Sequence, residues 1–270
     1  MKWTPTQVAA GLRAGRGRLR SAAWLPATLL TSAVLAGPSI RCLEPFSPPQ
    51  KPARPATAPA DTPAAAPKTD PNLVPLELKL PKPAFKGTPQ NIPPGTNLEK
   101  PRKGPRPPVL VPKGTHNVAL RKPLTSSEKD PIIGKIALVT DGDREASEGS
   151  YVELGPRLQW VQIDLKQKYA LRAVLLWHYH ASARVYHDVV VQVADDPDFI
   201  TNVRTLFNDD HDNSSGLGLG RDFEYWETYE GKLIEAGGTV ARYVRLYSNG
   251  STADDQNHYV EVEVYATAAK

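Results

Sequence analysis

The sequence is poor in cysteine: Cys42 is the only one in 270 residues, so no disulfide can form within one chain. It also lacks the Gly-x-Ser-x-Gly and His-Glu-x-x-His patterns that accompany a serine nucleophile or a catalytic zinc ion. Asp195, Asp196 and Asp198 stand together after an apolar run, but with Pro197 between them they are typical of a turn rather than of an acid and base pair. These absences predict a protein that is not an enzyme.

Long apolar runs are missing as well. A membrane-spanning helix needs about 20 apolar residues, whereas the run at residues 22–36 is shorter and contains Pro26. Arginines precede this run and Gly37 follows it, which is the pattern of a secretory signal. We therefore expect residues 1–42 to be a signal peptide or a signal anchor, and the protein to be periplasmic, on the cell surface or secreted. Lipidation at Cys42 is an alternative, although the three residues before it fit a lipoprotein signal poorly.

Large apolar residues are scarce between Pro45 and Pro112, a stretch that holds 20 of the 27 prolines. Such a segment buries too little apolar surface to offset the entropy of ordering it, so we expect residues 43–114 to be a disordered, basic linker. Residues 1–114 carry a net charge of +12 and residues 115–270 a net charge of −8. An acidic folded part is unsuited to phosphate backbones, which argues against nucleic acid as a partner. Membrane contact is expected only through the N-terminal segment.

Apolar and polar residues alternate at every second position in much of residues 115–270, which is typical of half-buried strands. In the last strand Val260, Val262 and Val264 alternate with Glu261 and Glu263, which predicts one buried face and one charged face. No segment there has a sustained helical period. The sequence therefore predicts an all-β domain, an antiparallel sandwich, preceded by the disordered Pro-rich segment.

Five motifs occur in an order that resembles the coagulation factor V/VIII type C, or discoidin, domain. This family shares a galactose-binding-like jelly roll with family 32 carbohydrate-binding modules. The matching segments are Asn-Val-Ala-Leu-Arg-Lys-Pro at 117–123, Val-Thr-Asp-Gly-Asp at 139–143, Gln-Trp-Val-Gln-Ile-Asp-Leu at 159–165, Ala-Arg-Tyr-Val-Arg-Leu-Tyr at 241–247 and Val-Glu-Val-Glu-Val-Tyr-Ala at 260–266.

The resemblance implies a structural calcium ion held by the Asp-Gly-Asp turn and the last strand. Its ligands would be Asp141, Asp143 and Glu261, with Ser147 or Ser150 adding an oxygen, and calcium accepts such oxygen ligands. The alternative is that the turn is only solvated and Glu261 lies on the surface. A second acidic loop, at residues 209–216, is a further place where a hard cation could bind.

The resemblance also implies a ligand site in loops at one end of the sandwich, where aromatic rings stack on sugars and polar side chains bond to hydroxyls. Two alternatives stay open for the histidines at 178 and 180: burial in the domain, or zinc binding with His187 or His211. The candidate ligand residues are His178, Tyr179, His180, Arg184, Tyr186, His187, Tyr225 and Trp226.

Taken together, these patterns favour an exported binding module that recognises carbohydrate or cell-envelope glycan. A protein partner, bound by a structural or interaction domain of a cell-surface complex, is the alternative.

Overall fold

The computed structural model describes residues 71–84 and 97–269. The expected signal at residues 1–42 and the linker residues 43–70 and 85–96 lie outside the described residues. No helix in the described ranges is long and apolar enough to cross a membrane.

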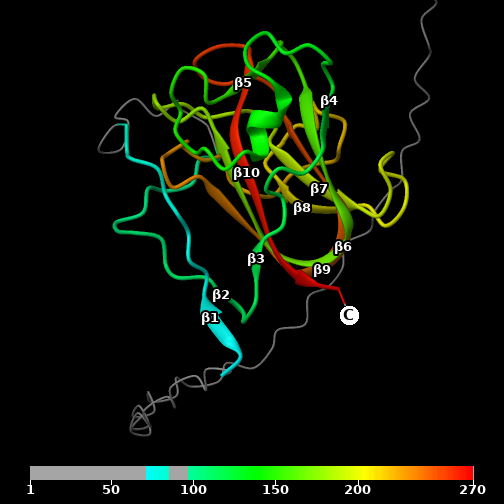
Figure 1. The fold of residues 1–270 in the computed structure, drawn as a ribbon. Helices are drawn as coiled ribbons and strands as arrows, with labels where there is room; N and C mark the ends of the chain where they lie inside the picture. The colour runs from blue at the N-terminus through cyan, green and yellow to red at the C-terminus, as the bar shows by residue number, and fades with distance from the viewer. Residues whose placement is uncertain (1–70, 85–96, 270) are drawn as a thin grey trace, which may run out of the picture. The chain divides into compact units, whose positions relative to one another are not determined.

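The described chain is built from strands and one short 3-10 helix (Figure 1). All strand pairs are antiparallel, and the main sheet has the order β3-β10-β6-β9-β7-β8, with β4 beside β6 and β5 beside β10. The elements are β1 (Leu73–Pro75), β2 (Leu110–Pro112), β3 (His116–Asn117), β4 (Leu124–Ser126), η1 (Ile136–Thr140), β5 (Val152–Leu154), β6 (Gln159–His178), β7 (Val190–Ala194), β8 (Arg204–Asn208), β9 (Lys232–Ser248) and β10 (Asn257–Ala268).

The two long strands, β6 and β9, each contribute to both layers of the domain. Residues 159–164 of β6 pair with β4 and with the end of β9, whereas residues 169–178 pair with β10 and with the start of β9. The register shifts between these two parts, at Lys166 with its positive φ of 74°. We call the layer with β4, β7 and β8 the first half-sheet, and the layer with β3, β5 and β10 the second half-sheet.

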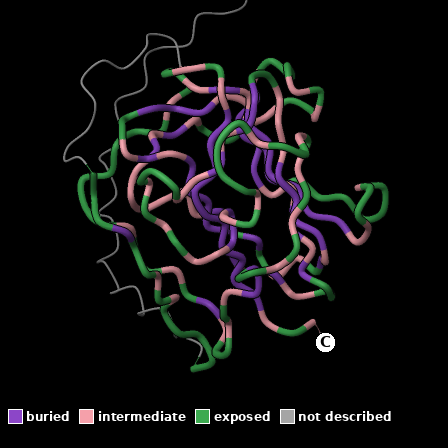
Figure 2. Tube along the Cα trace, turned by 45° about the horizontal axis from the view of Figure 1, so that its top comes forward, coloured by how far each residue is buried: buried purple, intermediate pink, exposed green. Residues whose placement is uncertain are grey.

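One apolar core fills the space between the half-sheets. It joins Val161 and Val191 of the first half-sheet to Val174 and Val262 of the second, all without exposed surface. Buried residues run through the middle of the domain in Figure 2, with exposed residues around them. This arrangement confirms the predicted all-β, antiparallel jelly-roll sandwich.

The outer face of the second half-sheet is covered by residues from the segment expected to be a linker. Leu76 and Leu78 pack against Leu175, Trp177 and Tyr265 on that face, and β1 pairs with β2. Residues 71–84 and 97–114, which were expected to belong to the linker, thus hold β1, β2 and contacts with this sheet. Of the few large apolar residues in this stretch, Leu76 and Leu78 find partners on the sheet, whereas Leu80 and Leu110 stay exposed.

The cover also corrects the predicted charged face of the last strand. Glu261 and Glu263 of β10 have no exposed surface. Arg144, from the loop after η1, forms an ion pair with Glu263, and the Glu263 carboxylate also accepts a hydrogen bond of 2.6 Å from the Tyr265 hydroxyl. Both faces of β10 are therefore buried: Val262 and Val264 face the core, and the covered face holds Glu261 and Glu263 together with the apolar Val260 and Tyr265.

Candidate functional site

Three of the predicted ligand residues, His178, His180 and Tyr186, lie in the interior. The Nδ1 of His178 lies 2.7 Å from the buried carboxylate of Glu227, and its ring stacks on Tyr186 with the centroids 4.3 Å apart. The Nε2 of His180 lies 2.9 Å from the carbonyl oxygen of Arg144. All three side chains are at most 1% exposed, so the structure places them inside the domain rather than on a surface open to a ligand. The histidines are core residues, the first of the two alternatives.

Zinc binding by these histidines finds no support in the geometry. Among the described residues, the group of candidate metal ligands whose atoms lie within 4.8 Å of one another contains only aspartates. His187 instead faces Glu224, with 3.6 Å between its Nδ1 and the carboxylate, and His211 faces the carbonyl oxygen of Asp222 at 2.8 Å.

Tyr179 and Arg184 lie at one end of the sandwich, where β6 ends and β10 begins; Tyr179 is half-buried and Arg184 is 8% exposed. The Arg184 guanidinium lies 4.8 Å from the centre of the Tyr179 ring, and its Nη1 donates a 3.1 Å hydrogen bond to Asp254. A second tyrosine, Tyr151, meets the Tyr179 ring edge to face with the centroids 5.1 Å apart. We call this set, together with Glu153 and His258, the loop-end cluster.

His258 lies at the centre of the loop-end cluster. Its Nδ1 lies 3.0 Å from the Tyr186 hydroxyl, and its Nε2 lies 3.3 Å from Glu153. Burial lowers the pKa of His258 below its ordinary value, and Arg184 acts in the same direction, although Asp254 and Glu153 oppose them. A neutral imidazole held at both nitrogens positions its neighbours, rather than acting as a free base.

Sequence reasoning missed Glu153, Asp254 and His258. They come from β5, the loop after β9 and the start of β10, and they meet because β5 pairs with β10 at Glu153 and His258. No short motif links them. The turn residues around Asp254 predict a loop, but which residues this loop meets in the fold depends on the pairing of β5 with β10.

The cluster combines the groups that a sugar site needs. Aromatic rings at Tyr151 and Tyr179 offer apolar surface with a polar tip. Arg184 donates hydrogen bonds, whereas Asp254, with 35% of its side chain exposed, and Glu153, with 17%, accept them. Such a set suits a ligand that carries hydroxyl groups on an otherwise apolar ring.

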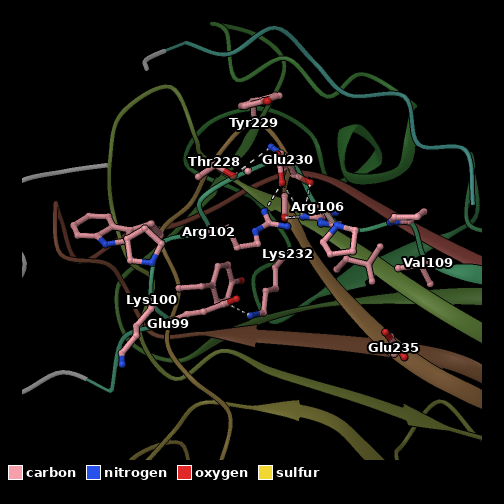
Figure 3. Close-up of a pocket in the computed structure, with 18 of the residues that line it drawn as sticks. Glu99, Lys100, Arg102, Arg106, Val109, Thr228, Tyr229, Glu230, Lys232 and Glu235 are labelled. Carbon is pink, nitrogen blue, oxygen red and sulfur yellow. Dashed lines mark hydrogen bonds and ion pairs between the residues drawn. The ribbon is translucent and has the colours of Figure 1, made fainter. Parts of the chain in front are cut away.

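The remaining predicted ligand residues, Tyr225 and Trp226, lie elsewhere. Both line a groove beside the start of β9, part of which Figure 3 shows. Tyr225 is 6% exposed, with its ring edge against Phe207. The predicted ligand residues therefore divide among the interior, the loop-end cluster, the His187 surface and this groove.

The predicted calcium turn is placed next to Glu261. The backbone N–H of Gly142 donates to Glu261 Oε2 at 3.1 Å, and the hydroxyl of Ser150 donates to Asp143 at 2.8 Å. Glu261 Oε1 is buried without a partner, and burial raises the pKa of this carboxyl group to about 9. A bound cation would satisfy the oxygen left without a partner, and the charge of Asp141 adds to the rise in the pKa of Glu261, but the three carboxylates are not among the described candidate ligands that lie within 4.8 Å of one another.

Carboxylates do gather in the second acidic loop. Oxygens of Asp188, Asp210 and Asp212 lie within 4.8 Å of one another. The loop itself uses them: Asp210 accepts hydrogen bonds from the backbone N–H groups of Ser214 and Ser215, and Asp188 accepts one from the Ser214 hydroxyl. These contacts account for the cluster as a loop-forming device, without an ion.

Comparison with known proteins gives similarities of fold. No family model matches the sequence, and no curated protein matches it. The CBM32 of AlyQ in complex with 4,5-unsaturated mannuronic acid is 15% identical with a TM-score of 0.39, covering 53% of this chain and 92% of that one. A Streptococcus pneumoniae fucose-binding module is 19% identical with a TM-score of 0.41, covering 56% of this chain and 98% of that one.

A longer protein also matches, in part. The family 89 glycoside hydrolase from Clostridium perfringens, in complex with 2-acetamido-1,2-dideoxynojirmycin, is 16% identical with a TM-score of 0.42. The match covers 57% of this chain but only 15% of the hydrolase. The similar structures include separate carbohydrate-binding modules, and the likeness concerns the fold alone.

Proposed function

We propose that the described domain is a non-catalytic module that binds a carbohydrate at the loop-end cluster. The observation that carries the proposal is the meeting of Tyr179, Arg184 and Asp254 at a partly exposed end of the sandwich. An aromatic face flanked by a fixed donor and a fixed acceptor can orient a pyranose through its C–H face and its hydroxyls.

A binding role accounts for the cluster better than catalysis does. Acyl transfer needs a nucleophile against a base, and in the described ranges no serine, threonine or cysteine side chain is hydrogen-bonded to a histidine. His258 is held at both ring nitrogens. The groups of the loop-end cluster are thus arranged to hold a ligand in place.

The biological setting belongs to the same proposal. The basic, apolar N-terminal pattern of residues 1–42 supports export, and a glycan of the cell envelope is then the carbohydrate within reach. We also propose a structural calcium ion at Asp141, Asp143, Ser150 and Glu261, supported by the unpartnered buried oxygen of Glu261. Such an ion would neutralise the buried carboxylate and tie η1 to β10.

Thermal unfolding of the full-length chain tests the function. A neutral sugar at about 100 times its dissociation constant adds roughly 2.7 kcal/mol of stability, which raises the unfolding midpoint. We expect at least one neutral sugar in a panel to raise the midpoint of the natural chain, and Tyr179→Ala to remove that rise. Absence of any response, or a response that survives Tyr179→Ala, would reject the loop-end cluster as the site.

A protein partner is a second candidate because of exposed apolar residues in the loop before β9. Leu219 is 70% exposed and Phe223 is 59% exposed. Lone exposed apolar residues are common, but two in one loop form a possible contact for another protein. Two results together would favour this candidate. No sugar in the panel would raise the unfolding midpoint, and adding a protein partner would slow the self-diffusion of the natural chain but not that of Phe223→Ser.

A further inference from the structure

A groove of about 560 Å³ lies between residues 99–110 and residues 225–235, away from the loop-end cluster. Its size falls within the range of about 300 to 1,000 Å³ that is usual for sites of small ligands. One wall is the segment first expected to be a linker, and the other is the start of β9 with the loop before it. Figure 3 shows charged side chains from both walls turned toward each other.

Positive charge exceeds negative charge in the lining of the groove. Arg102 and Arg106 both approach the carboxylate of Glu230, as Figure 3 shows, so two guanidinium groups share one carboxylate. Lys232 pairs with Glu99 at 2.7 Å. With Lys100 and Glu235 included, the lining holds four cations and three carboxylates, a net charge of +1.

Arg106 has hydrogen-bonding capacity left over. Its Nη2 donates to the carbonyl oxygens of Glu230 and Gly231, whereas its Nη1 is buried without a partner. Burial, and then the neighbouring Arg102, lower the pKa of Arg106 below its ordinary value. Burial disfavours the charged form of the guanidinium, Glu230 and Glu99 oppose this effect, and a bound anion would oppose it further.

Aromatic surface lies beside this charge. Trp226 and Tyr229 line the same groove, and the indole Nε1 of Trp226 is buried without a hydrogen-bond partner. The Tyr229 backbone is fixed by the Trp177 indole, which donates to its carbonyl oxygen at 2.9 Å. The groove lining thus holds two aromatic side chains and two unused donors, Trp226 Nε1–H and Arg106 Nη1–H.

We propose that the groove is a second binding site and that it takes an acidic saccharide, one with uronic acid units. The carboxylate would complete the partners of Arg106, a hydroxyl would accept from the Trp226 indole, and the sugar ring would lie against the aromatic side chains. Charge-assisted bonds from arginine to a carboxylate are among the stronger hydrogen bonds in proteins. An acidic peptide matches the charge but not the aromatic side chains of the lining.

Isothermal titration of the full-length chain with trigalacturonate tests the proposal. We expect binding that weakens about tenfold in Arg106→Gln and about tenfold in Trp226→Ala, each losing roughly one strong interaction. The uncharged methyl ester of trigalacturonate should bind about tenfold more weakly than the acid. Lys103→Gln is the matched control, because Lys103 is exposed on the same segment and does not line the groove.

The outcomes separate this site from the loop-end cluster. Tyr179→Ala should leave trigalacturonate binding unchanged, and Arg106→Gln should leave any neutral-sugar response unchanged. No binding of trigalacturonate, equal binding of its methyl ester, or an equal loss in Lys103→Gln would overturn the proposal. Binding of hexaglutamate as tight as that of trigalacturonate would also overturn it, in favour of an acidic peptide.

Discussion

Replacing Asp209 with asparagine is predicted to change how stability depends on pH. Asp209 follows β8 and is 3% exposed; its Oδ1 accepts a 2.7 Å hydrogen bond from the N–H of Val189, and its Oδ2 has no partner. Burial raises the pKa of Asp209 to about 8, and the negative charges of Glu224 and Asp188 add to this, whereas the Val189 N–H and Lys232 oppose it.

The direction of the effect follows from proton uptake. The folded chain holds Asp209 protonated up to about pH 8, whereas the unfolded chain ionises it near 3.8. The stabilisation is therefore complete below pH 3.8 and is lost as the pH rises through 8. Each pH unit inside this window removes about 1.4 kcal/mol, so going from roughly pH 5.5 to roughly pH 7.5 removes roughly 2 to 3 kcal/mol through this one group.

Asparagine keeps a carbonyl oxygen for the Val189 N–H but does not titrate. We expect urea unfolding of Asp209→Asn to show a weaker fall in stability between about pH 5.5 and about pH 7.5 than the natural chain, by roughly 2 kcal/mol. Asp198→Asn is the control, since Asp198 is exposed in a turn, and its profile should follow the natural one. Parallel profiles for Asp209→Asn and the natural chain would refute the assignment of a protonated Asp209.

Two further predictions concern the frame around the sites. Calcium should raise the midpoint of thermal unfolding, relative to EDTA, in the natural chain but not in Glu261→Gln. The control Glu77→Gln, at an exposed position, should respond like the natural chain. An unchanged midpoint in the natural chain would reject the ion. Gly231→Ala should cost about 2 kcal/mol or more in urea unfolding, because a Cβ there would lie 2.8 Å from the Leu176 carbonyl oxygen at a φ of +64°; a loss below half of that would contradict the close contact.

Strand periodicity in the sequence was sufficient to predict the sandwich but not what covers it. The alternation in β10 correctly marked Val260 and Val262 as buried, yet it placed Glu261 on a charged surface, whereas Glu261 has no exposed surface. The difference comes from Leu76 and Arg144, which lie far away in the sequence and cover that side of β10. Local patterns do not report such long-range cover.

The candidate site could be predicted only in part, for the same reason. The residues after β6 were expected to contact a ligand, and there Arg184 lies over the Tyr179 ring, although Arg184 itself is 8% exposed. His178 lies one residue earlier and is buried, because both faces of β6 are covered up to its end. His258 was missed because its place beside Glu153 depends on the pairing of β5 with β10.

The most direct test of the account is a glycan array probed with the natural chain and with Arg184→Gln. Arg184 is 8% exposed and fixed between Tyr179 and Asp254, whereas Arg221→Gln removes an exposed arginine as a control. The account predicts that the natural chain and Arg221→Gln bind the same neutral glycans and that Arg184→Gln loses them. Neutral-glycan binding that persists in Arg184→Gln, or an array on which the natural chain binds nothing, would contradict it.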